Sequence, residues 1–178
     1  YVYSVIDNSG SSENRPITNI SWFNAARFAN WMANGQPVGT QTNTTTENGA
    51  YALNGAETGY APAVNAINPN TNNPPTYFIP TENQWYKAAY YDPTLNNGAG
   101  GYYTFATKSN IIPDNQIGNL PNQANYLSEI TGYSVTQSAD YSTTQNYLTN
   151  VGAYSNSMSY YGTYDQTGNV YYRRKTED

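Results

Sequence analysis

The sequence predicts an irregular α+β domain in which two helices and a few short antiparallel strands are joined by long loops. Only two segments combine a helical period of apolar residues with capping signals. The rest of the chain alternates brief aromatic segments with stretches rich in Gly, Asn, Thr and Pro, which are typical of turns. A length of 178 residues suits one domain with its own core.

The first helix is predicted over residues 22–32. Ser21 precedes it as a typical N-cap, and Asn34 and Gly35 follow it as a typical C-terminal stop. Apolar residues recur at helical spacing, which predicts that one face packs against a core. That predicted face consists of Trp22, Ala25, Ala26, Ala29 and Met32.

The second helix is predicted to begin at residues 80–84. Thr81 and Gln84 have the spacing of a capping box, in which each side chain bonds the other's backbone N–H. The helix must finish near Tyr91, because Asp92 is followed by a proline and the residue before proline avoids helical geometry.

Short strands are expected between the loops, in segments where aromatic and β-branched residues gather. Loops as long as the one over 34–75 are usually functional or held by ions. We expect them to be pinned by hydrogen bonds from polar side chains to the backbone, because the chain is rich in Asn, Thr, Ser and Gln. The expected strands cover residues 1–6, 50–53, 76–79, 102–105 and 170–172.

Composition excludes several classes of function. The net charge is -5, whereas nucleic-acid binding needs clustered Lys and Arg. The one basic cluster, residues 173–175, is interpreted as a solvated tail. No apolar run is long enough to cross a membrane. The chain contains no cysteine and no histidine, so it performs no thiol or imidazole chemistry and forms no disulfide.

Three segments, in this order along the chain, resemble the successive signatures of the formylglycine-generating-enzyme (sulfatase-modifying factor) family. They are RPITNISWFNAARF at 15–28, IPTENQWYKAA at 79–89 and YGTYDQTGNV at 161–170. The resemblance covers nearly the whole chain, 1–178. It also implies that the chain lacks the family's N-terminal strand region and the part after the last motif. The implied fold is a variant of the C-type lectin fold with two helices and bound calcium.

The resemblance also says which chemistry the family requires. Its enzymes oxidise a cysteine of a peptide with copper held by two cysteines, because soft thiolates select Cu(I). In the family these cysteines follow the last motif, and relatives that use iron need histidine. Met32 and Met158 are isolated thioethers and do not replace them. We therefore expect no copper and no catalysis in this chain.

Calcium is the cofactor that the resemblance implies for this chain, since it takes carboxylate, amide and carbonyl oxygens. One implied loop uses the side chain of Asp165 with the carbonyls of Gly168 and Val170; the family's next glutamate is Tyr172 here. The other uses the side chains of Asn125 and Asp140 with the carbonyls of Tyr126 and Ser142. The alternative is that Asp140 and Asp165 only cap turns.

Three functions follow as hypotheses. The first is a non-catalytic binding or structural module of a bacterial secreted or surface protein, with a protein or glycan as ligand. The second is a fragment of a copper-dependent formylglycine-generating oxidase, and the third is a C-type-lectin-like sugar or protein receptor. Self-association is also expected, because a sheet that lacks the family's part after the last motif would expose the edge of a strand. Tyrosine pairs at 102–103, 160–161 and 171–172 form either a binding face or strands with one wet side.

Overall fold

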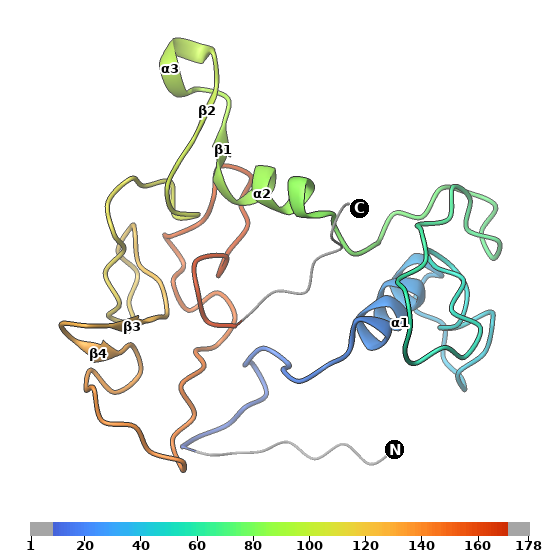
Figure 1. The fold of residues 1–178 in the computed structure, drawn as a ribbon, viewed down its shortest axis with the longest axis horizontal. Coiled ribbons are helices and arrows are strands. Elements are labelled where there is room, and N and C mark those ends of the chain that lie inside the picture. Colours follow the sequence, from blue (N-terminus) through green and yellow to red (C-terminus); the bar gives the residue numbers. More distant parts are fainter. Residues whose placement is uncertain (1–8, 171–178) are drawn as a thin grey trace. The chain divides into compact units, whose positions relative to one another are not determined.

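The computed structural model describes residues 9–170 and confirms the irregular α+β fold (Figure 1). Its antiparallel sheets each have two strands, β1 with β2 and β3 with β4, in the described part of the chain. Apart from these strands and three helices, the described residues form turns and loops. The helices and strands are α1 (Trp22–Ala33), α2 (Glu82–Tyr90), β1 (Tyr91–Asp92), α3 (Leu95–Gly98), β2 (Gly101–Tyr102), β3 (Leu127–Ser128) and β4 (Gly132–Tyr133).

The described residues divide into two compact units. One, the 19–82 unit, contains α1 and the long loop after it. The other, the 83–170 unit, contains the remaining elements. Residues 9–18 also belong to it and contact the chain near residue 150. There the Val151 N–H donates to the Asn14 carbonyl at 2.8 Å.

The two predicted helices, α1 and α2, begin and end where their capping signals predict. The Ser21 hydroxyl accepts from the Asn24 N–H at 3.1 Å, and Asn34 terminates α1. After α2, the Asp92 carboxylate accepts from the Thr94 N–H at 2.8 Å and so supports the turn that follows. None of the described helices is both long and apolar enough to span a membrane.

The buried face of α1 differs from the predicted one. Trp22, Ala25 and Met32 are only partly buried. The buried set is instead centred about one residue further round the helix, because the amide of Asn30 lies inward to bond the adjacent loop. This set is Phe23, Ala26, Ala29, Asn30 and Ala33.

The strands predicted at 50–53 and 76–79 are wrong, because neither segment pairs as a strand. They meet through a side chain: the fully buried Tyr51 hydroxyl accepts from the Ile79 N–H at 2.9 Å. The Trp22 ring packs edge-on against Tyr51 with centroids 5.1 Å apart, beside the buried residues of α1. In the predicted strand at 102–105, only Tyr102 belongs to a strand. The predicted strand at 1–6 lies outside the described residues, and so does the one at 170–172 except for Val170, which is in no strand.

Side-chain amides hold the loop after α1, as its composition predicts. Asn30 is fully buried and donates to the carbonyls of Thr46 and Tyr51 at 2.8 and 2.9 Å, while its own carbonyl accepts from the Tyr51 N–H at 2.7 Å. Fully buried Asn68 donates to the Ala33 carbonyl at 3.1 Å. The amides replace the backbone pairing that a sheet would supply, so the loop is ordered without being a strand.

An ion pair ties the middle of α1 to the same loop. The Arg27 Nε lies 2.6 Å from the Glu47 carboxylate, and both side chains are about nine-tenths buried. The Glu47 carboxylate also accepts from the Gly55 N–H at 2.6 Å, and Arg27 donates to the Ala56 carbonyl at 2.9 Å. Arg27 thus joins α1 to the loop at two points, the Glu47 carboxylate and the Ala56 carbonyl.

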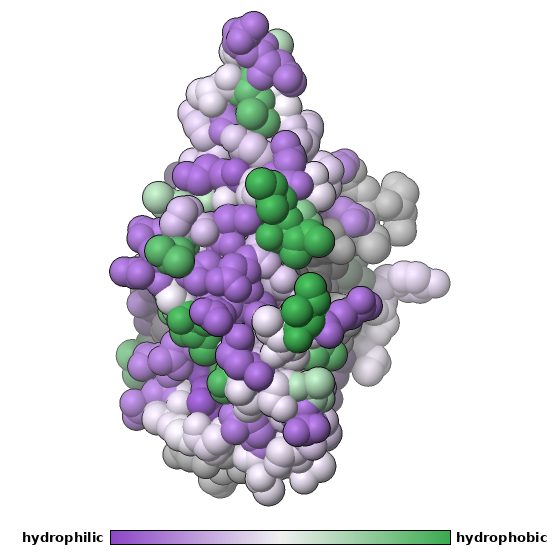
Figure 2. All heavy atoms as spheres, turned by 90° about the vertical axis from the view of Figure 1, so that its left-hand side faces the viewer, coloured by the Kyte–Doolittle hydropathy of each residue, from purple (hydrophilic) through white to green (hydrophobic). Residues whose placement is uncertain are grey.

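The surface on the side of β3 and β4 is mixed in character. Figure 2 shows separate groups of apolar side chains (green) among hydrophilic ones (purple). Ile112, Leu120 and Ile130 are exposed aliphatic residues of the 83–170 unit. Such groups are compatible with self-association, which stays a prediction.

Candidate metal site

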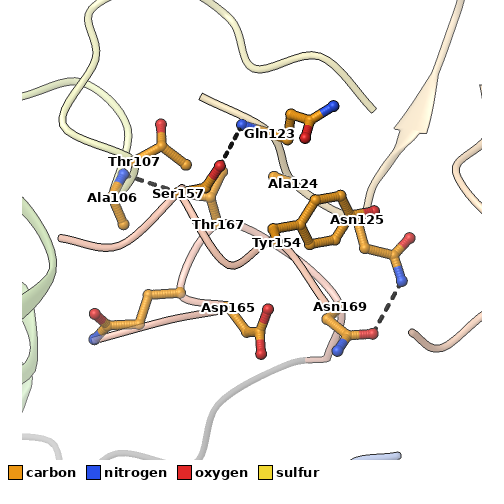
Figure 3. A pocket seen from close by; sticks show the side chains of 11 residues that line it. Ala106, Thr107, Gln123, Ala124, Asn125, Tyr154, Ser157, Asp165, Thr167 and Asn169 are labelled. Carbon is orange, nitrogen blue, oxygen red and sulfur yellow. Dashed lines mark hydrogen bonds between the residues drawn. The ribbon is translucent and has the colours of Figure 1, made fainter. Parts of the chain in front are cut away.

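A small cavity lies among the loops of the 83–170 unit (Figure 3). Its volume is about 10 Å³, enough for one water molecule or one ion. Segments that are far apart in sequence meet around it, including the third family-like motif. The lining residues are Ala106, Thr107, Gln123, Ala124, Asn125, Tyr154, Ser157, Asp165, Gln166, Thr167 and Asn169.

The polar side chains at this cavity are hydroxyls, amides and a single carboxylate, that of Asp165. Across residues 9–170, no group of three or more His, Cys, Asp or Glu is placed to hold a metal ion. A cation at this cavity would therefore rest mostly on amide, hydroxyl and carbonyl oxygens. Such hard oxygen donors suit calcium rather than copper or iron.

Two of the segments predicted to bind calcium meet here. The Asn169 N–H donates to the Asn125 carbonyl at 2.9 Å, and the Asn125 amide donates to the Asn169 side-chain oxygen at 2.9 Å. Gly168 has a φ of +107° and lies so close to the Asn125 carbonyl that a Cβ would collide with it. A glycine is required there for the motif to reach Asn125.

Asn169 was not among the predicted site residues, although it stands inside the third motif between two that were. Its side-chain oxygen also accepts from the Thr149 N–H at 3.0 Å. One amide thus holds the Asn125 and Thr149 segments together. The signal that could have found it is its position between Gly168 and Val170.

Two of the three predicted ligands in the loop at 165–170 already have partners within the protein. The Asp165 carboxylate accepts from the Gly152 N–H at 2.7 Å, a bond to a residue 13 positions earlier rather than within its own turn. The Gly168 carbonyl accepts from the Val170 N–H at 2.9 Å. Asp165 nevertheless lines the same cavity as Asn125, so the structure brings these two predicted ligands together.

Three residues of the other predicted calcium loop, Asn125, Asp140 and Ser142, bond to Tyr147. Its carbonyl accepts from the Asn125 amide at 2.9 Å. Its hydroxyl, at the far end of the side chain, accepts from the Ser142 N–H at 2.8 Å and donates to the Asp140 carbonyl at 3.3 Å. Asp140 and Ser142 are therefore gathered at the opposite end of Tyr147 from Asn125. The Tyr126 carbonyl does not line the cavity either.

Tyr154 is another cavity residue that sequence reasoning did not identify. It is 3% exposed, and its hydroxyl has no hydrogen-bond partner among the described residues. Burial raises the pKa of the phenol, the nearby Ser134 hydroxyl opposes this, and the Asp165 carboxylate raises it further. The Ser134 hydroxyl donates to the Tyr126 carbonyl at 3.1 Å and makes no hydrogen bond with the Tyr154 hydroxyl. A buried hydroxyl without a partner calls for a bound water or cation.

Comparison with known proteins agrees with the three motifs. The profile of the sulfatase-modifying factor enzyme 1-like domain matches residues 6–174. No curated protein and no solved structure gives a significant match to the chain. The matched region takes in α1, α2 and every residue of the cavity. The chain therefore belongs to the family of sulfatase-modifying factor enzyme 1-like domains.

Proposed function

We propose that this domain is a non-catalytic binding or structural module of its family, carried by a bacterial secreted or surface protein. The observation that carries the proposal is the absence of cysteine and histidine from all 178 residues. Copper oxidation needs thiolate ligands, and iron oxidation in relatives needs imidazole. The low charge and the Asn-, Thr- and Tyr-rich composition support a location outside the cytoplasm.

Calcium has a structural role in this proposal. Asn125, Asp165 and Tyr154 line one cavity, and the Tyr154 hydroxyl is buried without a partner, which supports a cation held by oxygen atoms. Asp140 and Ser142 define a separate candidate at the other end of Tyr147. A bound ion would join loops that otherwise share only hydrogen bonds, and so would stabilise the folded state.

We expect no copper-dependent oxidation of a cysteine-containing peptide by this chain, because no thiolate is present to hold the metal. The measurement is mass spectrometry of the peptide after incubation with the protein, copper and oxygen. An authentic formylglycine-generating enzyme serves as the positive control. Conversion of the cysteine above the protein-free rate would reject the non-catalytic proposal.

Calcium is expected to raise the melting temperature by about 5–10 °C at a concentration near 100 times its Kd, since such saturation adds about 2.7 kcal/mol. Asp165→Asn is expected to remove most of this rise while keeping the fold, because the new amide oxygen still accepts from the Gly152 N–H. Differential scanning calorimetry with calcium, with magnesium and with a chelator measures the shift.

Two further variants assign the site. Glu129→Gln makes the same change of charge at an exposed position of the β3–β4 hairpin and should keep the full shift. Asp140→Asn tests the candidate at the far end of Tyr147. If the calcium-induced rise in melting temperature is lost in Asp140→Asn and kept in Asp165→Asn, the calcium site is at Asp140. If calcium does not raise the melting temperature of the parent protein, the calcium proposal is rejected.

A further inference from the structure

Helix α2 leads directly into the β1–β2 hairpin (Figure 1). Five aromatic side chains form a continuous cluster on these two elements. Tyr86 stacks on Tyr102 with ring centroids 5.2 Å apart and planes inclined by 29°. Tyr91 lies 5.0 Å from Tyr102, and Tyr90 lies 4.8 Å from Tyr86. Trp85 extends the row through Tyr90 at 5.9 Å. We call these five residues the α2–hairpin cluster.

Local backbone geometry holds the cluster in place. Tyr86 and Tyr90 are four residues apart on α2 and therefore share a face. Tyr91 and Tyr102 are direct cross-strand partners in the antiparallel ladder. The Tyr91 ring also fills the space beside Gly100, where a Cβ would collide with its hydroxyl. The rings are thus ordered before any ligand arrives, which lowers the entropic cost of binding.

The cluster is only half covered. Tyr86 is 46% exposed and Tyr102 is 51% exposed, although both rings are large and apolar. A fixed, half-exposed group of aromatic rings with polar tips is typical of recognition surfaces rather than of cores.

Charge narrows the class of ligand. α2 carries two charged side chains of opposite sign, Glu82 and Lys87, and Lys87 lies over the Tyr91 ring at 5.5 Å. The carboxylate of the hairpin, that of Asp92, is buried and accepts a hydrogen bond from the Thr94 N–H. This balance, within a chain of net charge -5, disfavours a polyanion. The stacking of Tyr86 on Tyr102 leaves no gap between them for a cation, so the cluster is not an aromatic cage.

We infer that the α2–hairpin cluster binds neutral carbohydrate. Sugar rings present C–H groups, which the electron-rich faces of aromatic rings attract, beside hydroxyl groups that bond phenol hydroxyls. The surface is neutral, as such a ligand requires. The inference rests on the proposed binding role and names its ligand class. Because only two of the five rings are well exposed, we expect weak binding, which a polymer presenting many copies of the sugar makes measurable.

The test is affinity electrophoresis of the parent protein in gels containing a soluble neutral polysaccharide: hydroxyethylcellulose, xylan or glycol chitin. Retardation by at least one is expected, and heparin should give none. Trp85 fluorescence, titrated with the hexasaccharide of the retarding polymer, gives the Kd. We expect Tyr86→Ala and Tyr102→Ala each to weaken binding about tenfold. Tyr60→Ala, at a fully exposed tyrosine of the 19–82 unit, is the control and should change nothing.

Other outcomes separate the alternatives. Tyr86→Phe should keep most of the retardation if the ring carries the contact, and a chelator should not abolish it. No retardation in any gel, or retardation that survives both alanine variants, overturns the inference. Concentration-dependent sedimentation lost in Tyr86→Ala would assign the cluster to a second copy of the chain instead. If calcium stabilises the protein, no cysteine peptide is oxidised and no polysaccharide retards the protein, then only the carbohydrate inference is rejected. The proposed function is then unaffected.

Discussion

Replacing Asn30 with leucine is expected to lower the free energy of unfolding by about 3–5 kcal/mol, because buried backbone groups left without partners cost about 1–3 kcal/mol each. The Asn30 side chain is fully buried on α1 and bonds three backbone groups of the adjacent loop. These groups are the Thr46 carbonyl and the N–H and carbonyl of Tyr51. Chemical denaturation followed by circular dichroism measures the loss.

Asn24 supplies the matched control, because it is an exposed asparagine on the same helix. Asn24→Leu makes the same chemical change and should alter stability by less than about 0.5 kcal/mol. Equal stability of the two leucine variants would contradict the view that amides, rather than strand pairing, order the loop after α1.

Breaking the ion pair between α1 and its loop is the second large effect. Arg27→Met is expected to cost about 3 kcal/mol, since it leaves the Glu47 carboxylate buried without its cation. Replacing both residues, as Arg27→Met with Glu47→Leu, should cost less than the sum of the single changes, because no charge is then stranded. Denaturation of the parent protein, the two single variants Arg27→Met and Glu47→Leu, and the double variant gives the coupling energy. Strict additivity would show that the two residues do not stabilise the fold as a pair.

The same pair makes stability depend on pH. Burial alone raises the pKa of Glu47, but bonds from Arg27 and Gly55, with the Arg27 charge, outweigh it and hold the pKa below the ordinary 4.5. A carboxyl whose folded pKa is depressed contributes stability above its unfolded pKa, and this is lost as the pH falls through the folded value. Glu47→Gln should therefore flatten the loss of stability below pH 4.5, whereas Glu57→Gln, at an exposed position, should not.

Local signals predicted the parts of the fold that depend on neighbours in sequence. Ser21 and Asn34 bound α1 because capping involves residues within one turn of the helix end. The proline after Asp92 limits α2 for an equally local reason. The buried face of α1 was predicted about one residue out of place, because burial depends on the loop that packs against it and on the amide of Asn30.

The candidate metal site shows the same division. Asn125 and Asp165 were predicted from family-like motifs, but their approach to one cavity depends on the contact between Asn125 and Asn169, 44 residues apart. Tyr154 lies in no motif, and its burial beside the cavity is visible only in the folded chain. Sequence reasoning had no means of finding it.

Residue identity and short-range spacing were enough to establish the family, the ends of both helices and the absence of thiol and imidazole chemistry. The folded chain was needed to see that segments 50–53 and 76–79 meet through the Tyr51 hydroxyl rather than as strands. It was also needed to see which oxygen atoms share a cavity and which aromatic rings stay exposed. These features depend on burial and hydrogen-bond pairing between distant segments, which no local pattern encodes.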